Sequence, residues 1–120
     1  MTKILVVEDT EVNRLVLSRR LEKLGFEVET AVDGKDGLHK ARAVSPDIII
    51  MDMVLPKMDG GEVTMTLKKN EETKDIPIIA LTAHSVSNAR EASIDIGCDE
   101  YETKPVDFER LVAKIEQLIK

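Results

Sequence analysis

The sequence predicts an α/β fold, a doubly wound parallel sheet of five strands with five helices. Short apolar runs alternate with amphipathic segments five times along the 120 residues, a pattern typical of repeated strand–helix units. The runs 4–7 and 48–51 contain no polar residue, as expected for parallel strands that are covered on both faces. Glycine and proline stand at the predicted ends of several elements, where they interrupt regular structure.

We expect the strands at residues 3–7, 26–30, 47–52, 76–81 and 100–103. The second strand differs from the first and third because Phe26, Val28 and Thr30 alternate with glutamates. One wet face suits a strand at the edge of a sheet. Pro77 prevents a helix from continuing into the fourth strand, since proline has no backbone N–H to donate.

We expect the helices at residues 11–24, 35–44, 61–70, 85–97 and 108–119. In the first helix Leu17, Leu21 and Leu24 form one apolar stripe, and Gly25 is a typical C-cap. Asp107 is a good N-cap for the last helix, whose apolar residues recur at helical spacing. The periodicity is weakest in 85–97, which indicates either a helix packed through small residues or a loosely anchored one.

The composition describes one globular domain over residues 1–120. Hydrophobic residues make up 42% of the chain and charged residues 33%, which excludes a disordered chain. No apolar run could cross a membrane and no signal peptide opens the chain, so we expect a cytoplasmic protein without a membrane partner. The net charge of −6 argues against direct nucleic-acid binding. The single cysteine, Cys98, is expected to be a small buried hydrophobe.

Three acidic residues stand at the ends of the first and third predicted strands. Glu8 and Asp9 follow the first apolar run, and Asp52 follows the second. Because parallel strands end at the same edge of a sheet, we expect the three carboxylates to lie close together. Two carboxylates about 5 Å apart repel by about 3 kcal/mol at an effective dielectric of about 20, so the cluster must bind protons or a metal ion. Mg²⁺ fits best, since it is a hard cation that prefers oxygen ligands.

Other strand ends add to this cluster. Taken alone, Glu8 and Asp9 are compatible with acids that only cap the following helix, but the third acid favours a site. Thr82 and Lys104 close the fourth and fifth strands and should face the acids. Taken singly, Thr82 is compatible with a strand-end cap and Lys104 with a solvated charge. Together, Asp52 as nucleophile, a metal ion and Lys104 match aspartyl-phosphate chemistry.

Four motifs follow one another over nearly the full length of the chain. They are Val6-Val7-Glu8-Asp9, Asp52 with Met53-Val54-Leu55-Pro56 and Met58-Asp59-Gly60, Thr82-Ala83, and Tyr101-Glu102-Thr103-Lys104-Pro105. With these motifs the chain resembles the response-regulator receiver domains of two-component signalling, and is similar to the chemotaxis response regulator. The resemblance implies a flavodoxin-like sheet with the strand order 2-1-3-4-5.

The resemblance also implies a role for each matched residue. Asp52 corresponds to the phosphoacceptor. Glu8, Asp9, Asp52 and the backbone carbonyl of Val54 correspond to Mg²⁺ ligands, with Asp9 the closer of the acidic pair. Val54 and His84 correspond to positions that set the lifetime of the phosphoryl group. An apolar Val54 cannot orient an attacking water, which predicts hydrolysis no faster than moderate, whereas His84 is equally compatible with an exposed residue at a helix start.

A switch pair is implied as well. Thr82 and Tyr101 resemble the switch residues of the family. The threonine moves its hydroxyl to the phosphoryl group, and the tyrosine fills the space that the threonine leaves. Lys104 matches the residue that contacts the phosphoryl oxygens. Its bond to Pro105 is cis in similar proteins, an isomer that an X-Pro bond permits at modest cost.

The implied function is a phosphorylation switch rather than an enzyme. A histidine kinase or a histidine phosphotransfer protein supplies the phosphoryl group in a Mg²⁺-dependent reaction. Phosphorylation then changes the face formed by the fourth helix, fifth strand and fifth helix, which binds a downstream protein target. The domain catalyses its own phosphorylation and slow dephosphorylation.

Three other functions are compatible with parts of the sequence. A Mg²⁺-dependent phosphohydrolase would need a second acid two residues after Asp52, where Val54 stands. A flavin-binding carrier would need a glycine-rich phosphate loop, whereas the loop 8–11 is acidic. The complete set of site residues argues against a receiver that binds partners without being phosphorylated.

The context of the domain has two interpretations. Met1 directly before the first strand is typical of an independent short protein. The Asn13-Arg14 pair is similar to receivers attached to hybrid kinases.

Overall fold

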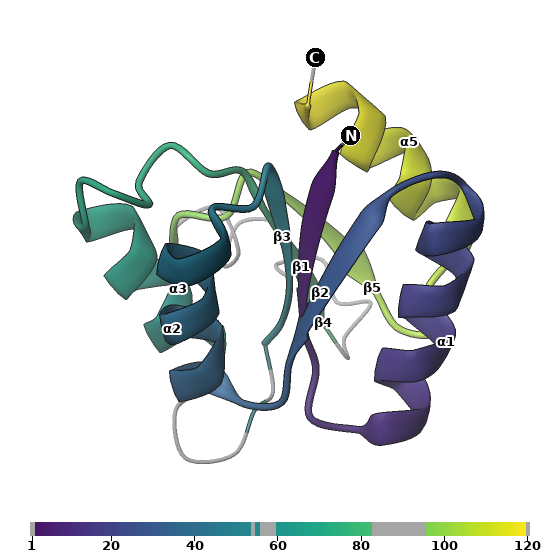
Figure 1. Ribbon diagram of the computed structural model, residues 1–120, viewed down its shortest axis with the longest axis horizontal. Helices are drawn as coiled ribbons and strands as arrows, with labels where there is room; N and C mark the ends of the chain where they lie inside the picture. The colour runs from purple at the N-terminus through teal and green to yellow at the C-terminus, as the bar shows by residue number, and fades with distance from the viewer. Residues whose placement is uncertain (1, 54, 56–59, 83–95, 120) are drawn as a thin grey trace.

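Five parallel strands form the central sheet of the computed structural model, which describes residues 2–53, 55, 60–82 and 96–119. The strands are β1 (Lys3–Val7), β2 (Glu27–Ala31), β3 (Ile48–Asp52), β4 (Ile78–Thr82) and β5 (Glu100–Thr103). Their order across the sheet is β2-β1-β3-β4-β5 (Figure 1), and every neighbouring pair is parallel. The predicted strand order and the edge position of β2 are confirmed.

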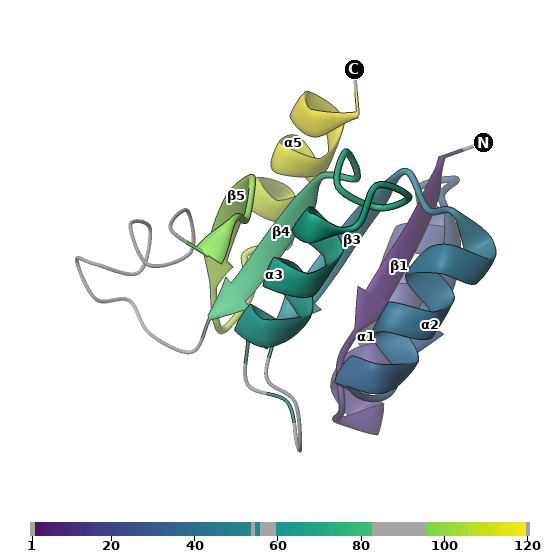
Figure 2. The same cartoon turned by 90° about the vertical axis from the view of Figure 1, so that its left-hand side faces the viewer.

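Helices cover both faces of the sheet. The helices α1 (Glu11–Lys23) and α5 (Phe108–Leu118) lie on one face, and α2 (Gly34–Val44) and α3 (Gly60–Lys69) lie on the other (Figures 1 and 2). Within the described residues there are four helices, so the predicted number of five is not confirmed. The remaining helix was expected at 85–97, which falls largely on residues 83–95, outside the described part. None of the described helices is long and apolar enough to span a membrane.

The two apolar runs are buried on both faces, as the sequence predicts. Ile48 and Ile50 join the core cluster under α1 and α5, whereas Ile49 and Met51 join the cluster under α2 and α3, because alternate residues of a strand point to opposite faces. All four side chains are fully buried. Cys98 belongs to the second cluster and is 4% exposed, which confirms its predicted burial. Burial raises the pKa of its thiol to about 11.

The end of α1 differs from the prediction at Leu24. Leu21 is buried but Leu24 is 54% exposed, so the predicted stripe is wrong at this position. The helix ends in a Schellman motif, in which the amide of Phe26 donates to the carbonyl of Leu21 and the amide of Gly25 to that of Glu22. Gly25 has a φ of 96°, which confirms its role in ending the helix. The chain turns there, and Phe26 instead of Leu24 packs against the core.

Pairing between strands brings their carboxyl ends to one level. Val7 is paired with Met51 on β3, and Asp52 with Leu81 on β4. Thr82 is paired in turn with Thr103 on β5. Residues that follow these positions therefore meet at a single edge of the sheet.

Gly60 brings α3 into close contact with this edge and gives a first testable prediction. A Cβ at Gly60 would lie 2.2 Å from the backbone oxygen of Asp52 and 2.7 Å from the Cα of Met53. Because backbone atoms cannot move aside as a flexible side chain does, we expect Gly60→Ala to lower the free energy of unfolding by about 3 kcal/mol. Urea denaturation measures this change.

The control is Met65→Ala, at a side chain of the same helix that is 46% exposed. Its free energy of unfolding should change by less than about 0.5 kcal/mol. Equal stability of the two variants would contradict the close approach of Gly60 to β3.

Candidate metal and phosphoryl site

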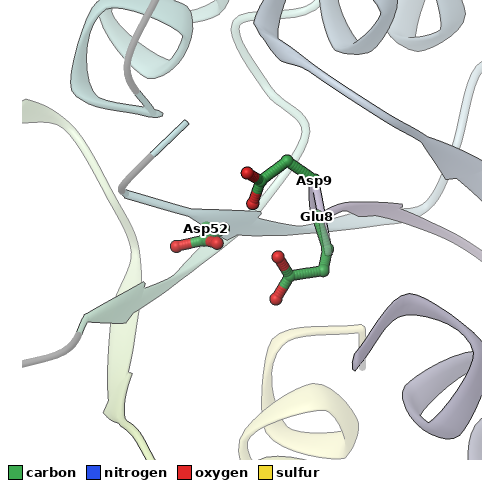
Figure 3. A group of neighbouring side chains, drawn as sticks. All are labelled: Glu8, Asp9 and Asp52. Carbon is green, nitrogen blue, oxygen red and sulfur yellow. The ribbon is translucent and has the colours of Figure 1, made fainter. Parts of the chain in front are cut away.

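Three carboxylates converge at the carboxyl edge of the sheet (Figure 3). Glu8 follows β1 and Asp52 ends β3, and each is 2% exposed, whereas Asp9 is exposed. One oxygen from each of the three residues lies within 4.8 Å of the others. The structure thus brings the three acids together, as the positions of the strand ends predict.

Backbone hydrogen bonds hold Glu8 in place. Its amide donates to the carbonyl of Ala31 at 3.1 Å, which extends the pairing of β1 with β2. Its carboxylate accepts from the amide of Thr10 at 3.1 Å. The guanidinium of Arg14 donates to the Glu8 carbonyl at 2.9 Å. Arg14 was not predicted to lie at the site, since a bond to a backbone carbonyl leaves no sequence pattern.

Lys104 reaches the acids from the end of β5. Its Nζ lies 3.0 Å from Oδ2 of Asp52 and 3.5 Å from Oε1 of Glu8. The amide of Lys104 donates to the carbonyl of Thr82 at 2.7 Å, which fixes the level at which β5 ends. The peptide bond between Lys104 and Pro105 is cis, as the resemblance implied.

The charges of the site perturb one another. Burial raises the pKa of Glu8, and the carboxylate of Asp52 raises it further, while the Thr10 amide and the Lys104 ammonium act in the opposite direction. Burial lowers the pKa of Lys104, but its hydrogen bond and ion pair with Asp52 and its contact with Glu8 outweigh burial, and the pKa is raised. Three acids against one lysine leave an excess of negative charge.

A magnesium ion fits this set of residues. The three side chains of the cluster offer only oxygen ligands, which suit a hard cation that uses few carboxylates together with water and phosphate oxygens. A divalent cation also offsets the charge that Lys104 leaves uncompensated.

The predicted switch pair lies on β4 and β5. Thr82 ends β4, and the register pairs Thr82 with Thr103 and Ala80 with Tyr101. Since paired residues of parallel strands share a face, Thr82 and Tyr101 lie on the same face of the sheet, on neighbouring strands. Val54 and His84, the two positions expected to set the phosphoryl lifetime, lie outside the described residues.

Glu102 is a buried charge for which the sequence predicted no role. It is 2% exposed and accepts hydrogen bonds from Arg110 at 2.9 Å and from Lys114 at 3.1 Å, both on α5. The hydrogen bond between Arg110 and Glu102, together with the negative charge of Glu102, raises the pKa of Arg110. The available signal was the i, i+4 spacing of Arg110 and Lys114, which places two cations on one face of the predicted helix.

An apolar groove opens beside the acids. It has a volume of about 560 Å³ and runs between α1 and the chain before α5, with Val16, Leu17 and Phe108 among its lining residues. Glu8 and Lys104 line the same groove. Apolar surface therefore continues from the acidic site onto the exposed side of α1.

A parallel α/β sheet with acids and a lysine at its carboxyl edge is typical of receiver domains. These domains are switches in two-component signalling. The family model of the response regulator receiver domain matches residues 4–116. The chain therefore belongs to this family. The family resemblance predicted from the motifs is confirmed.

A curated relative and two solved structures illustrate this membership. The chain is 38% identical over 120 residues to the DNA-binding dual master transcriptional regulator RpaA of Synechocystis, a match that covers all of this chain and 50% of RpaA. The chain thus spans about half the length of curated relatives that it matches.

The first solved structure is the chemotaxis protein CheY4 of Vibrio cholerae, with a TM-score of 0.90, 31% identity and 98% of each chain covered. The second is the receiver domain of a sensor histidine kinase from Pseudomonas aeruginosa, with a TM-score of 0.90 and 34% identity over 98% of this chain and 97% of that one. That structure has a magnesium ion coordinated in its active site cleft.

The perturbed pKa of Glu8 predicts how pH affects stability. Because burial raises this pKa in the folded chain, folding takes up protons and stability falls as the pH rises above about 4.5, the ordinary value for glutamate. Glu8→Gln removes the buried negative charge. Without metal we expect this variant to be more stable than the native chain at pH 7, by about 1 kcal/mol.

The difference between the two proteins should be much smaller near pH 4, where Glu8 is mostly protonated in both the folded and the unfolded native chain. Urea denaturation at both pH values in the presence of a chelator measures it. Glu116→Gln, at an exposed position of α5, should leave stability unchanged at both. A gap that stays the same at pH 4 and pH 7 would show that the charge of Glu8 is not its cause.

Proposed function

We propose that Asp52 accepts a phosphoryl group from the phosphohistidine of a histidine kinase or a histidine phosphotransfer protein in the cytoplasm. The position of Asp52 carries this proposal. Its carboxylate is buried, lies 3.0 Å from the ammonium of Lys104 and shares a cluster with Glu8 and Asp9. The similarity to a receiver domain of a sensor histidine kinase supports an input from such a kinase.

In the proposed reaction an oxygen of Asp52 attacks the phosphorus in line with the P–N bond of the phosphohistidine. This bond breaks, the imidazole leaves with the electron pair, and an acyl phosphate forms on Asp52. Lys104 offsets the negative charge of the transferring oxygens. Glu8, Asp9, Asp52 and the backbone carbonyl of Val54 would hold Mg²⁺, which when bound neutralises charge on the carboxylates and the phosphoryl oxygens.

The acyl phosphate is proposed to act as a conformational signal. The hydroxyl of Thr82 moves to a phosphoryl oxygen and Tyr101 fills the space behind it. This change alters the face formed by the 85–97 segment, β5 and α5, and so its affinity for a downstream protein. Hydrolysis of the acyl phosphate is no faster than moderate because an apolar Val54 cannot orient a water molecule, and His84 is the second position expected to affect its rate. The domain modifies itself and turns over no external substrate.

Apolar surface beside the site favours a protein as the phosphoryl donor. Val12, Leu15 and Val16 on α1 are 67%, 44% and 52% exposed, and Val16 also lines the groove that reaches Glu8. A small metabolite would gain little from apolar side chains that lie outside the groove, whereas a protein can cover them.

Phosphorylation of Asp52 can be tested directly. We expect incubation with Mg²⁺ and acetyl phosphate to add one phosphoryl group to the native chain, detected by intact mass, and none to Asp52→Asn. The adduct should be stable in acid and labile in base, as an acyl phosphate is, and a chelator should prevent its formation. Asp75→Asn, at an exposed residue before β4, is the matched control and should react like the native chain. Equal modification without metal would contradict the roles of Glu8 and Asp9.

The docking of a protein donor gives a separate prediction. We expect Leu15→Asp to slow transfer from a phosphohistidine protein that phosphorylates the native chain by about tenfold, since a charge in an apolar contact costs about 1.4 kcal/mol or more. Reaction with acetyl phosphate should be unaffected. Met65→Asp, at an exposed residue on the opposite face, should affect neither reaction. Equal slowing of both reactions by Leu15→Asp would indicate damage to the site instead of lost docking.

A further inference from the structure

The outer edge of β5 is closed by side chains. The amide of Tyr101 donates to Oε1 of Glu100 at 3.0 Å, and the amide of Thr103 donates to Oε1 of Glu102 at 3.3 Å. The carbonyl of Tyr101 accepts from Nζ of Lys114 on α5. An edge strand with unpaired backbone groups would pair with other chains, and charged side chains prevent this.

Lys114 contacts the side chain of Tyr101 as well as its backbone. Its Nζ lies 4.9 Å from the centroid of the Tyr101 ring, within the range of a cation–π interaction. The same atom lies 3.1 Å from Oε2 of Glu102 and 3.9 Å from Oε1 of Glu100. One ammonium therefore contacts both the ring and the carbonyl of the residue proposed to move in the switch.

Glu102 fixes the position of this ammonium. Its carboxylate is buried and also accepts from Arg110, so both of its oxygens are bound by α5. The side chain of Lys114 is 23% exposed, so less water competes for its contacts than at a fully exposed lysine. The cation beside Tyr101 is thus held by buried structure.

We propose that Lys114 is a positioning residue for Tyr101, which stabilises the arrangement in which the ring lies against the ammonium at the edge of β5. The inference rests on the proposed function, in which Tyr101 moves when Asp52 is phosphorylated. A contact present in only one of two arrangements shifts the equilibrium between them. Lys114 therefore sets how much of the unphosphorylated protein already occupies the other arrangement.

The opposite edge of the sheet supplies a matched control. Lys40 of α2 donates to the carbonyl of Thr30 on β2, and its Nζ lies 3.7 Å from Oδ2 of Asp36. Asp36 in turn accepts from the amide of Val32 at 3.0 Å. The two lysines close an edge strand in the same way, but the backbone that Lys40 contacts belongs to a threonine.

The test uses the emission of Tyr101, because the chain has one tyrosine and no tryptophan. Beryllofluoride with Mg²⁺ serves as a stable analogue of the acyl phosphate and is titrated into the native protein, Lys114→Met, Lys114→Arg and Lys40→Met. Before any analogue is added, we expect the Tyr101 emission of Lys114→Met to be shifted toward the emission of the native protein with the analogue bound. Half-saturation should require about threefold less analogue, since the competent arrangement is more populated.

Lys114→Arg retains the cation, so its emission before titration and its half-saturating analogue concentration should equal those of the native protein. Lys40→Met should match the native protein in both quantities. A merely structural role of Lys114 would change the melting temperature without these effects. If Lys114→Met does not melt cooperatively, Glu102→Gln replaces it, because this variant keeps the shape of the buried side chain and loosens the ammonium. Its emission and half-saturating concentration should change in the same direction as expected for Lys114→Met. If the variant that is measured has the native emission and half-saturating concentration, the proposal is overturned.

Intact mass after reaction with acetyl phosphate separates this proposal from the proposed function. If the native chain is phosphorylated and its emission responds, but Lys114→Met behaves as native, only the positioning role fails. If the native chain is phosphorylated without any change in Tyr101 emission, the positioning role is overturned together with the switch role of Tyr101. If the native chain takes up no phosphoryl group, the proposed function itself is wrong.

Discussion

The crowding of negative charge at the carboxyl edge of the sheet is the constraint on which the site depends. The pairing of Val7 with Met51 places the residues that follow at one level, so Glu8 and Asp52 cannot move apart without breaking the sheet. At about 5 Å such a pair repels by about 3 kcal/mol at an effective dielectric of about 20. Lys104 offsets part of this repulsion from two strands away, which requires β4 and β5 to end at the same level as β3. The site is therefore a property of the whole parallel sheet.

The sequence predicted the fold well because burial on both faces leaves an unambiguous pattern. The apolar runs of β1 and β3 and the alternation in β2 gave the inner strands and one edge correctly. Boundaries moved by up to two residues where hydrogen bonds decide them. For example, the amide of Ile76 donates to the carbonyl of Thr73, so a turn persists where a strand start was expected, and β4 begins at Ile78. The prediction that Leu24 belongs to the apolar stripe was wrong, because helical spacing does not specify where Gly25 turns the chain.

The acidic site was predictable for the same topological reason, since strand ends in a parallel sheet converge whatever their separation in sequence. The environment of Glu102 was not. Alternation within a short edge strand places a glutamate equally well in solvent, and only the packing of α5 against the sheet buries it beside Arg110 and Lys114. Burial of that kind depends on the distance between two elements, which local sequence patterns do not specify. The positions of Glu8 and Asp52 at strand ends identify them in the sequence, whereas the burial of Glu102 can be recognised only from its contacts with Arg110 and Lys114.

Protection of the sheet edges and the proposed switch share residues at β5. Both edge strands place a lysine from the following helix on an outward carbonyl, Lys40 on β2 and Lys114 on β5. At β2 this contact closes an edge and involves none of the three clustered acids. At β5 the same requirement puts an ammonium beside Tyr101, on the strand that Lys104 directly follows. Lys114, one of the residues that close this edge, is therefore also placed to bias the ring of Tyr101. Loss of the Lys114 ammonium must alter both properties together, because this one group contacts the carbonyl and the ring of Tyr101.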